Sequence, residues 1–332
     1  MPKTRDPIFD IMKGFAILFV VMSHTFFPDI SNKVFVSLRS PLFFLVSGYF
    51  AKEWFFFDFI KNGAKRLLIP LLFTYLLMIP IVIMLDYLLE TNVILIALKS
   101  MALGTSSWDP PGSNVSQISA GPLWFVWSSI LVRIYWSFLQ KWGGNWMLGI
   151  SIFLLAIIAY HVKMYVTLPF SILSSFGALG FFYVGYIIKK HSLLENEKGK
   201  QFFPICLLCL FYCICFSRID VNFCVYNAFY IIDVLGCVAT FFILHKVIKS
   251  YYYENRFWNF IQFVGRYSLV ALCVHSIDQC IWVDWSPFKL WYFFQTNFEL
   301  TCAYLIRILF VVSITYLISK NQFLREKIFF IK

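Results

Sequence analysis

Residues 67–89 read LLIPLLFTYLLMIPIVIMLDYLL, and Asp86 is the only charged residue among them. The hydrocarbon core of a bilayer is about 30 Å thick, and an α-helix of about 20 mostly apolar residues crosses it. This stretch is therefore long and apolar enough to span a membrane as one helix. Whether the protein is built from such helices depends on the rest of the chain.

The composition of the whole chain also indicates a membrane protein. Of the 332 residues, 60% are hydrophobic, 21% are aromatic and 14% are charged, and the mean hydropathy is +0.75. Soluble domains have about 25% charged and about 45–50% apolar residues, and a chain of about 300 residues still exposes about a quarter of its unfolded surface. A soluble globule, a disordered chain and a secreted disulfide scaffold are therefore excluded. The predicted fold class is an all-α polytopic membrane bundle.

Windows of helical length predict about ten transmembrane helices. They lie near residues 9–28, 33–51, 67–89, 120–140, 145–162, 168–188, 201–217, 227–248, 259–282 and 299–319. Residues 93–103 suit a short surface helix, and residues 104–120 are rich in Gly, Pro and Ser, which predicts a loop. No repeat or second domain is recognisable, so residues 1–332 are expected to form a single transmembrane domain. No small-residue cleavage site follows the basic N-terminus, so we expect no cleavable signal peptide.

The net charge of +11 is informative when it is divided among the predicted loops. With the N-terminus inside, the inner segments hold 18 of the 28 Lys and Arg residues and the outer segments hold five. The positive-inside rule favours this orientation. An even number of spans then places both termini in the cytoplasm. The charge thus predicts an orientation in the bilayer, and we expect no nucleic-acid partner.

Four cysteines, Cys206, Cys209, Cys213 and Cys215, lie in an apolar run that contains no His, Asp or Glu. A free cysteine in such a setting behaves as a small hydrophobic residue, so we expect no metal site. The sequence also lacks the motifs of zinc hydrolases, serine hydrolases and P-loop NTPases.

Ionisable residues inside the predicted spans are candidate functional groups, because each costs roughly 2.5–3.5 kcal/mol to insert into a bilayer. They are Asp10, Lys13, His24, Arg39, Arg133, Asp233, Arg266, His275, Asp278 and Arg307.

Three of these residues, Asp10, Lys13 and His24, share one face of the first predicted helix. Lys13 and His24 are eleven residues apart, which is three helical turns plus about 20°. Asp10 precedes Lys13 by three residues, and this spacing makes the two side chains neighbours. A simple Asp10–Lys13 ion pair is the alternative interpretation of those two residues, but it leaves His24 unexplained.

His275 and Asp278 are three residues apart in the ninth predicted span. A carboxylate beside a histidine can hold its tautomer and stabilise the imidazolium. His24 and His275 are each about fifteen residues from the inner end of their spans, so the rise of about 1.5 Å per residue puts them at similar depth. We therefore expect the two histidines to share one site. Two separate buried histidines, each with a backbone or hydroxyl partner, are the alternative.

Several motifs occur in order along the chain. They are Arg5-x4-Asp10-x2-Lys13-Gly14 with Val20-Val21-x2-His24, Pro41-Leu42-Phe43-Phe44-x2-Ser47-Gly48-Tyr49, Lys65-Arg66-Leu67-x2-Pro70, Leu123-Trp124-Phe125, Tyr183-x-Gly185-Tyr186 and Gly265-x2-Ser268-Leu269-x5-His275. As an ordered set they resemble the acyltransferase-3 membrane O-acyltransferases, in the short form without an attached soluble hydrolase-like domain. Arg39 departs from the pattern, since many members have His there, and Ser23 stands where Gly is usual.

The resemblance implies transfer of a short acyl group, usually acetyl, from acyl-coenzyme A to a hydroxyl of a cell-envelope glycan or its lipid-linked precursor. The implied partners are acyl-coenzyme A, the sugar acceptor and the lipid bilayer. The implied location is the bacterial cytoplasmic (inner) membrane, and no metal is required.

Under this interpretation His24 acts as the general base on the acceptor hydroxyl, because an imidazole titrates near neutral pH. Lys13 binds the donor or stabilises developing negative charge. His275 positions the acceptor or assists the proton transfer, and Asp278 orients His275.

A second group of residues is expected to hold the substrates. Arg66, with Lys65 and Lys61, is the candidate for the coenzyme A phosphates, since cations and free backbone donors at a helix start hold phosphate. Plain positive-inside charge is the alternative for these three. The candidate substrate-binding residues are Arg39, Trp124 and Asp10.

A transporter or flippase for lipid-linked saccharides fits the composition equally well. Many transporters show an internal repeat, and none is recognisable here. The intramembrane ionisable groups also gather around histidines. Both features favour an enzyme, and binding or cleavage of acyl-coenzyme A distinguishes the two classes. A different membrane acyltransferase fold would also use a histidine, but it would not predict the shared face of Lys13 and His24.

Overall fold

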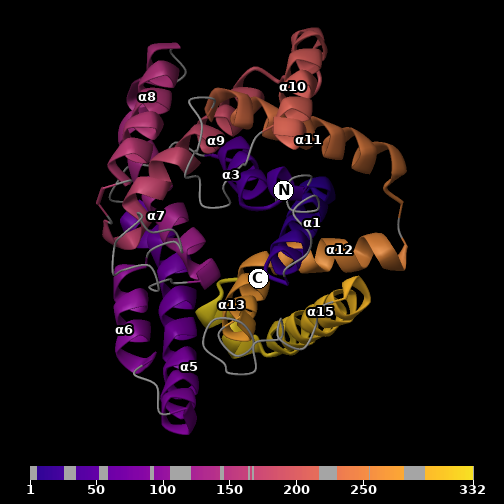
Figure 1. The fold of residues 1–332 in the computed structure, drawn as a ribbon. Coiled ribbons are helices and arrows are strands. Elements are labelled where there is room, and N and C mark those ends of the chain that lie inside the picture. Colours follow the sequence, from indigo (N-terminus) through magenta and orange to yellow (C-terminus); the bar gives the residue numbers. More distant parts are fainter. Residues whose placement is uncertain are drawn as a thin grey trace.

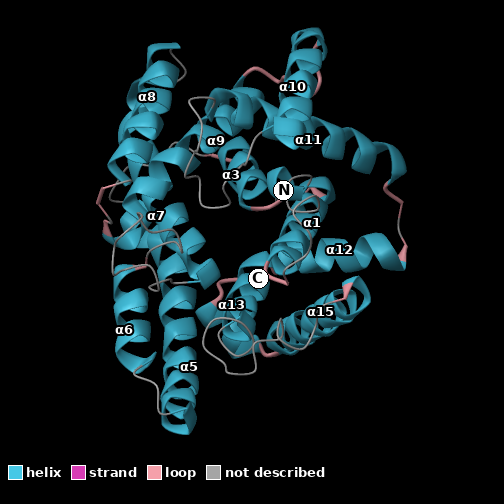
Figure 2. Cartoon of the chain, viewed as in Figure 1, coloured by secondary structure: helices cyan, strands magenta, loops and turns pink. Residues whose placement is uncertain are grey.

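The structure is a computed structural model, and all of its regular secondary structure is helical within the residues that it describes (Figure 2). These residues are 6–25, 35–51, 59–89, 93–104, 121–142, 146–163, 165–166, 168–216, 230–253, 255–279 and 296–331. The predicted all-α polytopic class is thereby confirmed. The predicted loop at 104–120 lies almost entirely outside the described residues.

The described helices follow the chain in the order labelled in Figure 1. They are α1 (Pro7–Ser23), α3 (Ser40–Tyr49), α5 (Lys65–Leu89), α6 (Val93–Leu103), α7 (Trp124–Leu139), α8 (Trp146–Lys163), α9 (Ile172–Lys190), α10 (Glu197–Phe216), α11 (Tyr230–Tyr251), α12 (Arg256–Arg266), α13 (Ser268–Gln279) and α15 (Asn297–Lys320). Shorter 3-10 and π-helical turns include η2 (Phe59–Ala64), η3 (Gly121–Leu123) and η7 (Leu324–Ile328). The short helix predicted at 93–103 is α6.

Six described helices are long and apolar enough to cross a membrane: α5, α7, α9, α10, α11 and α15. The consecutive helices α12 and α13 together make a seventh candidate, and α3 and α8 are shorter apolar helices. The protein is therefore a multi-pass membrane protein by the length and composition of its helices. The total of about ten spans and the position of the termini stay predictions.

The ninth predicted span differs from the structure. Residues 259–282 were predicted as one helix, whereas α12 ends at Arg266 and α13 begins at Ser268, with an angle of 77° between them. The two halves have different environments. Trp258, Ile261 and Val264 form the buried side of α12, while nearly every residue of α13 is buried. A hydropathy window averages over both halves and misses the break.

Helix α1 lies at the centre of the molecule and contacts α3, α11, α12, α13 and α15 (Figure 1). Its crossing with α12 brings backbone against backbone. A side chain at Gly14 would collide with the carbonyl of Ile261, and one at Gly265 would collide with the carbonyl of Asp10. These two glycines therefore let α12 pack directly on the half of α1 that carries Asp10 and Lys13.

Candidate active site

The two predicted histidines come together where α1 ends. His24 is the C-terminal cap of α1, and His275 lies in the middle of α13. Their ring centroids are 5.3 Å apart and the rings are tilted by 49°. The two rings are therefore neighbours, whereas a shared functional site stays a prediction. Their surroundings differ, because His24 lines a small cavity while the side chain of His275 is 0% exposed.

Asp278 connects His275 to an arginine of the last long helix. The Nδ1 atom of His275 lies 3.1 Å from Oδ2 of Asp278. The same carboxylate oxygen accepts hydrogen bonds from Nε and Nη2 of Arg307, at 2.9 and 2.6 Å. Buried charges require such pairing. The predicted contact between Asp278 and His275 is therefore present, and Arg307 is the third member of the cluster.

Arg307 also holds the end of α1. Its Nη1 atom donates to the carbonyl oxygen of His24 and, at 3.3 Å, to the hydroxyl of Thr25. The last carbonyls of a helix lack intrahelical partners, and a cation there is favourable. We call His24, His275, Asp278 and Arg307 the histidine network. The sequence had marked Arg307 only as an ionisable residue within a span, and its partners are distant in sequence.

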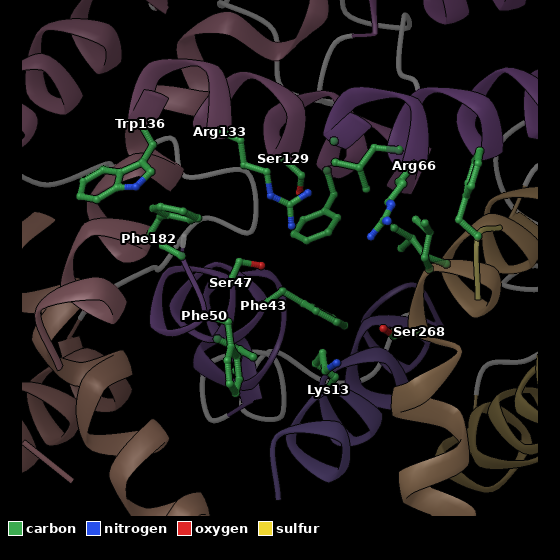
Figure 3. Close-up of a pocket in the computed structure, with 18 of the residues that line it drawn as sticks. Lys13, Phe43, Ser47, Phe50, Arg66, Ser129, Arg133, Trp136, Phe182 and Ser268 are labelled. Atoms are coloured by element: carbon green, nitrogen blue, oxygen red, sulfur yellow. The ribbon is translucent and has the colours of Figure 1, made fainter. Parts of the chain in front are cut away.

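A second feature is a cavity of about 510 Å³ that Lys13 lines together with Arg66 and Arg133. Figure 3 shows Arg66 and Arg133 reaching into it from α5 and α7, while Lys13 and Ser268 lie on the opposite side. Ser47 of α3 also points into it (Figure 3). The remaining wall is largely aromatic. We call this space the cationic cavity.

The charges of the cationic cavity are held in two ways. Lys13 forms the ion pair with Asp10 that was the alternative interpretation of these two residues, with Nζ 2.7 Å from Oδ1. The pairing is therefore real, but Lys13 still lines the cavity. Arg66 and Arg133 have no hydrogen bond or ion pair with any other described residue. From the sequence, Arg133 was recognisable only as an ionisable residue within a predicted span.

Other candidates occupy less central positions. Lys65 is exposed at the start of α5, and the side chain of Lys61 lies outside the described part of the structure. Asp10 is buried beneath Lys13. Arg39 is only 2% exposed, and its Nε donates to the carbonyl of Phe35 at 3.4 Å. None of these four is among the described residues that line the cationic cavity or the small cavity at His24.

The small cavity at His24 has a volume of about 20 Å³. Trp124, a predicted substrate-binding residue, also lines it. Three apolar residues, Phe43, Phe125 and Leu272, line both this cavity and the cationic cavity. The histidine and the cations therefore face two spaces that one apolar wall separates.

No group of three or more metal-ligating side chains occurs within the part of the chain that the structure describes. Among the clustered cysteines, Cys206 and Cys213 are buried, and the thiol of Cys213 lies 3.4 Å from Oδ1 of Asp233. This cluster lies between α10 and α11, away from the histidine network in the sequence and in its contacts.

The sequence was compared with families and with individual proteins. A family model described as an acyltransferase domain matches residues 6–320. Comparisons with curated proteins and with solved structures give no match. The family match spans nearly the whole chain. It includes the complete histidine network, the cavity at His24 and the cationic cavity except for Phe329 and Phe330. The chain therefore belongs to the acyltransferase-3 family, and it is a multi-pass membrane acyltransferase.

Proposed function

We propose that this protein transfers an acetyl group from acetyl-coenzyme A to a hydroxyl of a cell-envelope glycan or lipid-linked sugar. The location that we propose is the bacterial cytoplasmic membrane, with the N-terminal end of α1 toward the cytoplasm. One observation carries the proposal: a cavity lined by three cations and a cavity lined by His24 share a single apolar wall. The phosphates and the reacting end of the donor thus have separate, adjoining places.

The cationic cavity suits the donor. Coenzyme A carries phosphate groups, and guanidinium groups bind phosphate with two parallel hydrogen bonds. Arg66 and Arg133 have no partner among the described residues, so both are available to a ligand. A volume of about 510 Å³ lies within the range of about 300–1,000 Å³ that is typical of ligand sites.

The spacing along α1 assigns Lys13 to the donor phosphates. Eleven residues at about 1.5 Å each place Lys13 about 16 Å from His24 along the helix axis. At this distance Lys13 is too far away to stabilise charge on a carbonyl that reacts beside His24. An extended pantetheine arm has a comparable length, so phosphates near Lys13 and a thioester near His24 can belong to one donor molecule.

His24 is the proposed general base. It removes the proton from the acceptor hydroxyl while the hydroxyl oxygen attacks the thioester carbonyl. The new carbon–oxygen bond forms, the carbon–sulfur bond breaks, and the coenzyme A thiolate leaves and takes up the proton. General base catalysis of this kind contributes about 10²–10⁴-fold to a rate.

His275 is a positioning residue in this proposal. Its Nδ1 lies by the Asp278 carboxylate, which accepts a hydrogen bond, so the neutral ring carries its lone pair on Nε2. That Nε2 atom is buried and has no partner among the described residues. It can accept an N–H from the adjacent ring of His24. The other nitrogen of His24 then faces the acceptor as the base.

The test uses the purified full-length protein in lipid nanodiscs, with acetyl-coenzyme A and envelope glycan from a strain that lacks the gene. We expect His24→Ala to lose acetyl transfer by at least about 10²-fold while still binding coenzyme A. The matched control is His191→Ala, since His191 is an exposed histidine at the end of α9. Full transfer by His24→Ala contradicts the base role. A transporter of lipid-linked saccharides would neither bind acetyl-coenzyme A nor cleave its thioester.

A further inference from the structure

The wall between the two cavities consists of side chains from three helices. Phe43 comes from α3, Phe125 from α7 and Leu272 from α13. The rings of Phe43 and Phe125 are in contact, with centroids 5.4 Å apart and planes tilted by 59°. Phe125 is held further by Phe44, at a centroid distance of 4.8 Å. Phe43 and Phe125 therefore form a packed aromatic contact within the wall.

The spaces on the two sides of this wall differ greatly in size. The cationic cavity measures about 510 Å³, and the cavity at His24 measures about 20 Å³. On the same measure one water molecule needs roughly 10–15 Å³. The space beside His24 therefore holds about one group of methyl size. Pro122 and Trp124 line it and do not line the cationic cavity.

We propose that Phe43, Phe125 and Leu272 set the length of the acyl group that this acyltransferase transfers. This inference rests on the proposed function. The acceptor hydroxyl must meet His24, so the thioester carbonyl has to reach the wall from the cationic cavity. The part of the acyl group beyond the carbonyl then enters the small cavity. A methyl group fits there, while a propyl chain collides with the aromatic rings.

Shape is the property that selects in this cavity. Its lining includes Ser23 and Ser40 beside the apolar side chains. Unbranched acyl chains differ only in their methylene groups, which make no hydrogen bonds, so these serines do not distinguish one chain length from another. A hydrophobic pocket that is one methylene too small or too large discriminates by about 10- to 200-fold. The wall residues therefore determine the specificity for acyl-chain length. His24 acts as the base for any acyl group that the cavity admits.

The experiment measures glycan acylation with acetyl-, propionyl- and butyryl-coenzyme A, using the same nanodiscs and extracted glycan. The readout is the ratio of kcat/KM for butyryl to that for acetyl transfer. The wild-type protein is expected to prefer acetyl by at least about tenfold. Phe43→Ala and Phe125→Ala are each expected to raise the butyryl-to-acetyl ratio about tenfold or more. Phe43→Leu and Phe125→Leu keep an apolar side chain for the case in which an alanine variant does not fold.

The control is Phe50→Ala. Phe50 lines the cationic cavity and not the cavity at His24, so its substitution is expected to leave the acyl-length ratio unchanged. Leu272→Phe narrows the small cavity below the size of a methyl group and is therefore expected to reduce acetyl transfer itself.

Two results overturn the inference while leaving the proposed function intact. One is equal transfer of acetyl and butyryl groups by the wild-type protein. The other is an unchanged ratio in folded variants of both Phe43 and Phe125. A wild-type protein that transfers no acyl group from any of the three donors overturns the proposed function, and this inference with it.

Discussion

The histidine network and the cationic cavity both contain arginines, and they hold them in opposite ways. Arg307 is 2% exposed and makes hydrogen bonds to Asp278, His24 and Thr25. Arg66 and Arg133 face open space and have no partner among the described residues. A satisfied buried cation fixes the geometry around it, whereas an unpaired cation at a cavity is available to an anionic ligand. Both regions adjoin α1. The paired arginine lies at His24, and the unpaired arginines face the cavity that Lys13 lines.

The largest expected loss of stability comes from breaking the buried ion pair of the histidine network. Arg307→Met leaves the Asp278 carboxylate buried and without its cation, and such a change costs about 3–5 kcal/mol. Thermal or denaturant unfolding of the purified protein measures this loss. Replacing both partners, in Arg307→Met with Asp278→Leu, is expected to recover much of the stability, because it removes the uncompensated charge. Acyl transfer is not expected to recover with it.

An exposed ion pair provides the control for this first prediction. Lys200 and Glu197 approach to 2.7 Å, but both side chains are more than 70% exposed. Exposed pairs contribute about 0–1 kcal/mol, so Lys200→Ala is expected to change stability by no more than that. If Arg307→Met costs as little as Lys200→Ala, the network does not hold the end of α1.

The next effect in size concerns binding at the cationic cavity. Hydrogen bonds to charged groups contribute about 1.5–3 kcal/mol, and each 1.4 kcal/mol is about tenfold in affinity. Arg66→Ala and Arg133→Ala are therefore each expected to weaken coenzyme A binding by roughly 10- to 100-fold, with little effect on unfolding. Titration calorimetry measures the affinity, and added salt is expected to reduce the difference between variants and wild type.

Arg256→Ala is the matched variant for that prediction, because Arg256 is an exposed arginine at the start of α12. It is expected to leave coenzyme A affinity nearly unchanged. Equal weakening by all three arginine variants would mean that the bulk positive charge attracts the donor, and the cavity would lose its assigned role.

The smallest of these effects concerns the close packing of α12 on α1 near Lys13. Gly265→Ala places a methyl group against the backbone carbonyl of Asp10. Overpacking of this kind costs about 1–3 kcal/mol, and it should shift α12 away from α1 near Lys13. Gly149→Ala is the comparison, since the added methyl group lies 3.2 Å from the side chain of Tyr183, whereas at Gly265 it collides with a backbone carbonyl oxygen. If both variants unfold at the same temperature, the close crossing of α1 and α12 contributes little to stability.

Local features of the sequence predicted much of this molecule. The apolar stretch at 67–89 forms most of α5, and residues 93–103 form α6. Each stretch is mainly apolar over its whole length. Spacing on a helix also predicted the Asp10–Lys13 pair and the contact of His275 with Asp278. Both are neighbours three residues apart, so helical geometry alone brings them together.

Contacts between distant segments could not be predicted from the sequence. Helix α12 packs closely on α1 before the break at Tyr267, and a hydropathy window contains no information on a partner helix. Arg133 and Arg307 were recognised as ionisable residues, but their places at the cavity and in the network depend on tertiary packing. Arg39 is a further example, because the structure buries it outside the described lining of both cavities.

The bond from Arg307 to the carbonyl of His24 joins residues that are 283 positions apart. A ribosome adds about 5–20 residues per second, so on the order of half a minute of synthesis separates the two partners. During that interval α1 is already made, while α13 and α15 are not. Arg66 and Arg133 precede α13 as well, so a nascent chain contains the cations of the cationic cavity long before it can complete the histidine network. The histidine network is therefore completed last, as α15 enters the membrane.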